Sequence, residues 1–386
     1  MFKLANKVDR ISPFYAMELV KHAAVLEAQG RDIVHMSIGE PDFTAIDAVV
    51  QALEAAVRAG QTQYTAAVGL PMLRQAIAAF YETRFGAKID PARVIVTAGA
   101  SGALMLAMTA LLEQGDEVLM ADPAYPCNRH FVTAAGGNPR LIPTGPEDRF
   151  QLAPAQVREH WNERTAGVII ASPSNPTGTS IAPGALAELV QEVRQRGGFT
   201  IVDEIYLGLS YDEERRSAAT LGDDVIIVNS FSKYFDMTGW RLGWLIVPPQ
   251  LIGAFEKLAQ NLVICASTLS QHAALACFTP SALAEFEVRR EAFRQRRDYL
   301  LPQFERLGLH VPVKPDGAFY IYADVSQHSA DSDEFAARML EEAGVCAVPG
   351  MDFGQAASHR YMRFSYASSM PRLEEAVARL GRFLRR

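Results

Sequence analysis

The chain has 386 residues, 49% of them hydrophobic and 21% charged, which suits a globular protein with two domains or one large domain with an appendage. Its 37 basic and 44 acidic residues give a net charge of −7 without a long basic run, which argues against a nucleic-acid or anionic-membrane partner. The longest apolar stretch, residues 103–112, is too short for a membrane span, and the polar N-terminus lacks a signal-peptide apolar region, so we expect a cytoplasmic protein.

The first third of the chain alternates between helical and strand-like segments. Apolar residues at helical spacing predict the helices, and short β-branched runs predict the strands. The predicted elements are a helix at 14–30, a strand at 33–38, helices at 48–59 and 70–86, a strand at 94–97, an apolar helix after the turn at 98–102, and a strand at 117–120.

The same alternation continues to about residue 247. It predicts helices at 129–135 and 185–196 and strands at 167–171, 199–202, 225–228 and 242–247. Most of these strands are apolar on both faces, which indicates an α/β fold with a largely parallel sheet covered by helices. In such sheets ligands bind at the carboxyl ends of the strands.

The pattern of charged and apolar residues changes near residue 283. A long charged helix at 285–307, strands at 319–323 and 362–365 and a helix at 371–385 predict a smaller α+β domain. We expect residues 1–45 to join this small domain, residues 46–282 to form the large domain, and residues 283–386 to complete the small one.

The most informative segment follows the strand at 225–228. Residues 230–241 read SFSKYFDMTGWR and bring together Ser230, Ser232, Lys233 and Arg241. An aldehyde cofactor needs a lysine whose amine can be neutral, and its phosphate needs hydroxyls and a cation. Taken alone, Lys233 could equally be a solvated loop lysine.

Two further strand ends carry polar groups. Asp203 ends the strand at 199–202, where a carboxylate could hold a pyridine nitrogen protonated, and Tyr206 follows three residues later. Asn175 lies in the turn at 172–178, SPSNPTG, which presents an amide at the end of the strand at 167–171. A helix-capping Asp, a core Tyr and an ordinary Asx turn are the alternatives.

The two remaining strand ends complete the pattern. The turn at 99–102 opens a helix, so its free N–H groups around Ala100 and Ser101 suit a phosphate, although close helix packing would need the same small residues. Tyr125 follows the strand at 117–120, where its ring could stack on a flat heterocycle or simply pack in the core. All five features lie at one edge of one sheet, which favours a shared site.

In these motifs and their order, the chain resembles the class I aminotransferases of pyridoxal-phosphate fold type I, over nearly the whole length from residue 37 to residue 363. The resemblance implies that Lys233 binds pyridoxal 5'-phosphate, that Asp203 lies at the pyridine nitrogen, and that Tyr125 stacks on the ring. It implies further roles, with Tyr206 and Asn175 at the ring oxygen, Ser101, Ser230, Ser232, Arg241 and the Ala100 backbone at the phosphate, and Gly39, Asn175 and Arg363 at the substrate carboxylate. Ile46, Asp47 and Asp236 depart from the family pattern without touching this chemistry.

Tyr64 resembles the tyrosine that reaches the phosphate of the partner subunit, so a homodimer with shared active sites is implied. The expected reaction is ping-pong transfer of an amino group from an L-amino acid to a 2-oxo acid. The segment 261–271 contains no cation, which favours neutral or aromatic donors with 2-oxoglutarate or pyruvate as acceptor, unless Arg129 or a lysine from elsewhere substitutes.

Two alternatives remain at this stage. A C–S β-lyase or a decarboxylase would use the same cofactor and the same lysine. A cofactor-binding regulator would be expected to add a basic DNA-binding arm, and none precedes residue 14. The four cysteines, at 127, 265, 277 and 346, include no CxxC pair and predict free thiols and no metal site.

Overall fold

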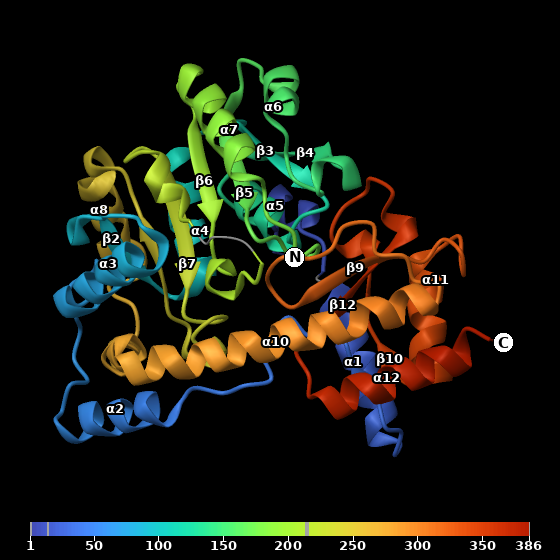
Figure 1. Cartoon of the computed structure of the whole chain (residues 1–386). Coiled ribbons are helices and arrows are strands. Elements are labelled where there is room, and N and C mark those ends of the chain that lie inside the picture. Colours follow the sequence, from blue (N-terminus) through green and yellow to red (C-terminus); the bar gives the residue numbers. More distant parts are fainter. Residues whose placement is uncertain (1, 14, 213–215, 386) are drawn as a thin grey trace.

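The computed structural model describes residues 2–13, 15–212 and 216–385. Its centre is a seven-stranded sheet with the strand order β2-β8-β7-β6-β5-β3-β4 (Figure 1). Only β8 is antiparallel to its neighbours, so the sheet is mostly parallel and the predicted α/β class is confirmed. The strands are β2 Val94–Thr97, β3 Glu117–Asp122, β4 Asn138–Pro143, β5 Thr165–Ala171, β6 Phe199–Asp203, β7 Ile226–Ser230 and β8 Gly243–Ile246.

Helices cover both faces of this sheet because its central strands are apolar on both sides. Along β5, Ile169 faces the core shared with α4 and α8, whereas Val168 and Ile170 face the core shared with α6 and α7. The helices of this part are α2 Asp47–Arg58, α3 Pro71–Phe85, α4 Gly99–Leu111, α5 Pro126–Ala134, α6 Pro154–His160, α7 Pro183–Gln195, α8 Ile252–Leu262 and α9 Thr268–Ala274.

The C-terminal part forms a second, smaller sheet in the order β11-β12-β9, all antiparallel. The long helix α10 runs beneath both parts of the molecule (Figure 1). The elements are α10 Pro280–Arg306, β9 Tyr320–Asp324, α11 Ser332–Arg338, β10 Val345–Cys346, β11 Val348–Pro349, β12 Tyr361–Ser365 and α12 Met370–Phe383. The predicted domain boundary at residue 282 falls inside α10, so no break in the chain marks it. The division into domains stays a prediction.

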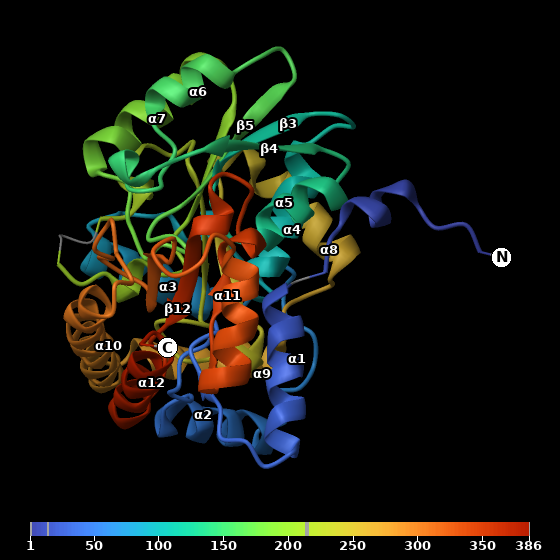
Figure 2. The same ribbon diagram turned by 90° about the vertical axis from the view of Figure 1, so that its right-hand side faces the viewer.

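The N-terminal segment joins the C-terminal part. Helix α1, Tyr15–Ala28, packs against β10 and β11, and β1, Val34–His35, pairs in parallel with β10. Residue 14, where the first predicted helix begins, lies outside the described residues. In Figure 2 the arm before α1 extends towards α5, where Lys7 Nζ donates to Ala134 O at 2.8 Å.

Several predicted bounds needed correction. The strand predicted at 33–38 keeps only two residues. Met36 N still donates to Cys346 O of β10 at 2.7 Å, but Met36 O accepts from Ser365 N of β12 at 2.6 Å, so the pairing with β10 ends there. The helix predicted at 129–135 starts earlier, at Pro126, where a missing N–H costs nothing. Among the described residues, no helix is both long and apolar enough to cross a bilayer.

Candidate active site

A cavity of about 460 Å³ lies at the carboxyl ends of the sheet strands. Twelve of the thirteen predicted site residues line it, although the sequence scatters them from residue 39 to residue 363. They are Gly39, Ala100, Ser101, Tyr125, Asn175, Asp203, Tyr206, Ser230, Ser232, Lys233, Arg241 and Arg363. Tyr64 is the exception; its side chain is 79% exposed and does not line the cavity of its own chain.

Lys233 follows β7 and points its amine into the cavity region. Its Nζ donates to the backbone carbonyl of Gly39 at 2.5 Å. Removal from water lowers the pKa of Lys233 to about 8, with the negative charge of Glu40 opposing the shift and the positive charge of Arg363 adding to it. This amine can therefore lose its proton near neutral pH, as a covalent link to an aldehyde requires.

Asp203 ends β6 and is buried. Its carboxylate accepts from the backbone N–H of Ile205 at 3.0 Å. Burial raises the pKa of Asp203 to about 6, while that hydrogen bond and the charge of Lys233 work in the opposite direction. A buried acid of this kind fits the protonated nitrogen of a pyridine ring, which would supply the missing positive partner.

Arg363, on β12, is a buried guanidinium held between two aromatic rings. Tyr320 and Phe353 lie with their ring centroids 4.5 and 4.8 Å from its Cζ atom. Nη1 donates to Asn175 Oδ1 at 2.9 Å and Nη2 donates to the carbonyl of Ser37 at 2.6 Å.

No acid among the described residues forms a direct ion pair with Arg363, although the buried Asp352 attracts it electrostatically, and its buried Nε has no hydrogen-bond partner in the described structure. A buried charge without a counter-ion is costly, so this position suits an incoming carboxylate.

The phosphate end of the site lies where α4 meets β8. Ser230 Oγ donates to Ser232 Oγ at 2.8 Å, which places two hydroxyls together. Arg241 lies beside the first turn of α4, because Gly99 has no side chain; a Cβ there would lie 2.8 Å from Arg241 Nη2. Two hydroxyls, a guanidinium and the free N–H groups of a 13-residue helix form a donor set that fits a phosphate dianion.

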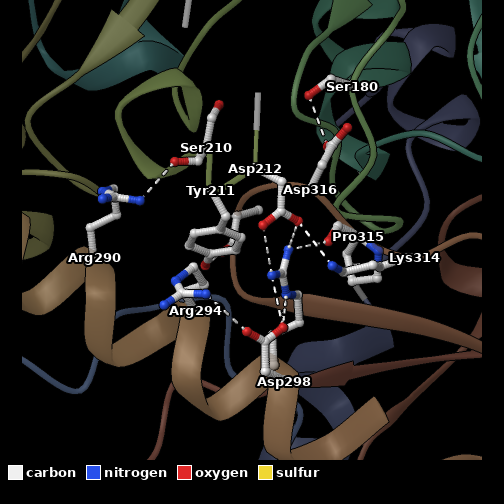
Figure 3. Close-up of polar contacts among 12 residues, drawn as sticks. Ser180, Ser210, Tyr211, Asp212, Arg290, Arg294, Asp298, Lys314, Pro315 and Asp316 are labelled. Carbon is white, nitrogen blue, oxygen red and sulfur yellow. Dashed lines mark hydrogen bonds and ion pairs between the residues drawn. The ribbon is translucent and has the colours of Figure 1, made fainter. Parts of the chain in front are cut away.

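The segment that follows Asn175 is bonded to the loop at 314–316 and to Gly317 next to it. Figure 3 shows the contact between Ser180 and Asp316. The backbone N–H groups of Asp316 and Gly317 donate to the carbonyl of Gly178 at 2.9 and 3.0 Å, and Ser180 Oγ donates to Asp316 Oδ1 at 2.9 Å. The same loop is bound to α10 through Pro315 O. These bonds fix the end of the turn, and the Asn175 amide itself is held by Arg363, whose Nη1 donates to its oxygen.

Other cavity residues are absent from the predicted set. Ala16, Met17 and Val20 of α1 form an apolar wall, Glu40 adds an acid, and the Tyr320 hydroxyl lies 2.8 Å from that of Tyr206. The helical spacing of 16 and 20 and the position of Glu40 beside Gly39 are visible in the sequence. Their place at the cavity follows only from how α1 and β9 pack.

Comparisons with known proteins agree with this geometry. The model of the family "Aminotransferase class I and II" matches residues 31–380. The valine–pyruvate aminotransferase of Mycobacterium tuberculosis is 40% identical over 376 residues, covering 97% of each chain.

Two solved structures show the same fold. An aminotransferase from Mycobacterium tuberculosis superposes with a TM-score of 0.96 at 39% identity, covering 100% of both chains. The structure of the Thermus thermophilus aspartate aminotransferase with maleate has a TM-score of 0.93 to this chain at 35% identity. The match covers 99% of this chain and 100% of that one. The chain therefore belongs to the class I and II aminotransferase family and is a transaminase.

Proposed function

We propose that this aminotransferase uses pyridoxal 5'-phosphate, linked covalently to Lys233, to move the amino group of an L-amino acid to a 2-oxo acid in two half-reactions. One observation carries the proposal. A single cavity contains an amine that can be neutral, a buried carboxyl group and a buried guanidinium that forms no direct ion pair with the described residues. These three groups match the aldehyde, the ring nitrogen and the substrate carboxylate in turn.

The cofactor, when bound, would supply an electron sink that lets the substrate Cα–H bond break. The protein would supply the proton transfers and the orientation. Once the substrate amine had replaced it on the cofactor, the freed Lys233 Nζ would take the proton from the substrate Cα and give it to the cofactor carbon that carried the aldehyde. With a pKa of about 8, roughly a tenth of this amine is neutral at pH 7, several hundred times more than for an ordinary lysine.

The other residues would hold the reacting groups in place. Asp203 would keep the ring nitrogen protonated, Tyr206 and the Asn175 amide would donate to the ring oxygen, and Tyr125 would stack on the ring. Ser101, Ser230, Ser232, Arg241 and the Ala100 backbone would bind the phosphate. Arg363 would bind the α-carboxylate, with Gly39 beside it.

We propose a donor with one carboxylate and a neutral side chain. Among the described lining residues the cations are Lys233, Arg241 and Arg363, so only Arg363 remains for the substrate. The wall formed by α1 is apolar, and Glu40 would repel a second carboxylate.

The predicted substitute Arg129 does not line the cavity, and its Nη2 donates to Asp352 O at 3.1 Å. The same reasoning favours pyruvate over 2-oxoglutarate as acceptor, and the name of the mycobacterial relative, a valine–pyruvate aminotransferase, agrees with it.

The test begins with a visible spectrum of the protein mixed with pyridoxal 5'-phosphate. We expect a yellow chromophore that amino donors bleach, with valine or phenylalanine at least about tenfold better than aspartate in kcat/KM, and parallel-line kinetics with pyruvate. Lys233→Ala should abolish both the chromophore and turnover. Lys257→Ala, which removes an exposed lysine on α8, is the matched control.

Each part of the proposal has its own contrary result. Full turnover by Lys233→Ala would refute the role of that lysine. Free ammonia, or carbon dioxide, in place of a transferred amino group would indicate a β-lyase or a decarboxylase. A strong preference for aspartate would overturn the proposed substrate class alone.

A further inference from the structure

A buried carboxylate outside the cavity binds a loop of the C-terminal part to the end of β3. Asp122, 4% exposed, is the last residue of that strand. Its two oxygens accept from the backbone N–H of Gln355 at 3.1 and 3.0 Å, and Oδ2 also accepts from Ala356 N at 3.2 Å. The described residues give Asp122 no ion-pair partner, so its charge is balanced by these N–H groups.

The contact is close enough to require glycine on the loop. A Cβ on Gly354 would lie 1.6 Å from Asp122 Oδ1, a distance that no side chain tolerates. Next to it, Ala124 N donates to Phe353 O at 2.9 Å. The segment 352–356, which we call the clamp loop, is therefore fixed to the sheet at several consecutive points.

The clamp loop in turn contacts the predicted substrate-binding groups. The buried ring of Phe353 lies against the guanidinium of Arg363, with 4.8 Å between ring centroid and Cζ, on a side chain that also contacts the ring of Tyr320. The carboxylate of Asp352 accepts from the backbone N–H groups of Tyr15 at 3.0 Å and Ala16 at 3.4 Å, which begin α1.

We propose that Asp122 is a positioning residue for substrate binding: through the clamp loop it sets the place of Arg363 and of the α1 wall relative to the sheet that carries the cofactor site. The inference rests on the proposed function, because it assigns Arg363 to the substrate carboxylate. Asp122 does not line the cavity, and its side chain is bonded to the clamp loop; Gly354→Ala, which disturbs that loop without changing the segment from Asp122 to Tyr125, separates this route from one along the chain.

The test compares variants on the two sides of one contact. Asp122→Ala removes both acceptor oxygens, Asp122→Asn keeps one, and Gly354→Ala leaves Asp122 intact but displaces the loop. Asp90→Ala, which removes an acceptor of Ala92 N outside the lining of the cavity, and Gly184→Ala, whose Cβ would meet no atom within 4 Å, are the matched controls.

Two quantities are measured on the cofactor-loaded protein: the KM and kcat for a neutral amino donor, and the dissociation constant of 3-methylbutanoate by calorimetry. We expect KM and the dissociation constant to rise about tenfold in Asp122→Ala and Gly354→Ala, and about threefold in Asp122→Asn. The value of kcat and the visible spectrum should stay within about twofold of the wild type, because Lys233 and Asp203 are not moved. The controls should change none of these values.

The contrary results are distinct. Variants that keep the wild-type KM and dissociation constant, or that lose kcat and cofactor binding with KM unchanged, overturn the role of Asp122 and leave the proposed function standing. Wild-type protein that binds neither pyridoxal 5'-phosphate nor the carboxylate overturns both. If Asp122→Ala does not fold, KM and the dissociation constant of Asp122→Asn and Gly354→Ala are compared with those of the wild type and the controls instead.

Discussion

Burial acts on Lys233 and Asp203 in opposite directions. It lowers the pKa of the amine from 10.5 to about 8 and raises that of the carboxyl from 3.8 to about 6. The two values, ordinarily almost seven pH units apart, come within about two of each other around neutral pH. Both groups can thus gain or lose a proton near the pH at which an enzyme works, as general acids and bases require.

Replacing Lys233 by Met should stabilise the cofactor-free protein at pH 7. Since the folded-state pKa lies below its ordinary value, the unfolded chain binds more protons between about pH 8 and 10.5, and wild-type stability rises with pH in that window. The advantage of Lys233→Met should therefore shrink by on the order of 3 kcal/mol between pH 7 and pH 10.5. Urea unfolding at several pH values measures it; a pH-independent difference would contradict the lowered pKa.

Of the residues that line the cavity, those at the ends of strands could be predicted from the sequence, whereas most of the others could not. Asp203 and Lys233 could be placed because the carboxyl ends of parallel strands meet at one edge. Met17 and Tyr320 could not, because they reach the cavity only through the packing of a separate part of the chain. Tyr64 was predicted for a neighbouring subunit and stays a prediction.

Among the elements, α10 shows how differently two arginines on one helix can behave. Arg297 is fully buried; it donates from Nη1 and Nη2 to the carboxylate of Asp212 at 2.5 and 3.1 Å and lies over the ring of Tyr211. Arg294, one turn earlier, pairs with Glu291 at the surface. Figure 3 shows Tyr211, Asp212 and the loop at 314–316 gathered against the helix, with Ser180 bonded to Asp316 of that loop.

Arg297→Met should destabilise the protein by about 2–3 kcal/mol, because Asp212 and the Pro315 carbonyl lose a buried partner. Arg294→Met should leave the urea midpoint unchanged, since its ion pairs are exposed and screened. The two midpoints, measured side by side, are the check. Equal midpoints for the two variants would show that the buried network contributes nothing.

Several helices and one strand were not predicted from the sequence, most of them for physical reasons. Strand β4 contains Pro139 and Pro143, which argue against a strand, yet it pairs only with β3 and an edge tolerates proline. Helices α6, α9 and α11 are only seven residues long, too short for a clear periodicity. Helix α8 could have been found, because its buried Phe255 and Ala259 are four residues apart.

For the whole molecule, the exposed Tyr64 is best understood in an assembly. Its loop is bound to α9, where Thr268 Oγ1 donates to Gln63 O at 2.7 Å, so it is not a loose tip. Leu262, Val263 and Ile264 are also largely exposed, which is unusual for consecutive apolar residues of a single chain. We propose a homodimer in which Tyr64 of each chain reaches the other chain's phosphate.

A mixing experiment tests the shared site. Lys233→Ala should be inactive and Tyr64→Phe should be impaired at limiting cofactor, yet a refolded equal mixture should recover about a quarter of wild-type activity, because half of the dimers are hybrids and each hybrid regains one intact site of two. Sedimentation should give a dimer for all three samples. A mixture no more active than its components would contradict the shared site, and a monomer would contradict the dimer.

The antiparallel strand β8 has a consequence for how the chain is made. Among the described strands β2 pairs only with β8, through Val94 with Ile246 and Thr97 with Gly243, so about 150 residues must leave the ribosome before this edge of the sheet can close. Until then the apolar strand β2 lacks its partner strand. Helix α4, which follows β2 and carries the phosphate end of the site, lacks the strand β8 against which it packs. Pairing across such a distance is slow. We expect nascent chains that stop short of β8 to be captured by chaperones.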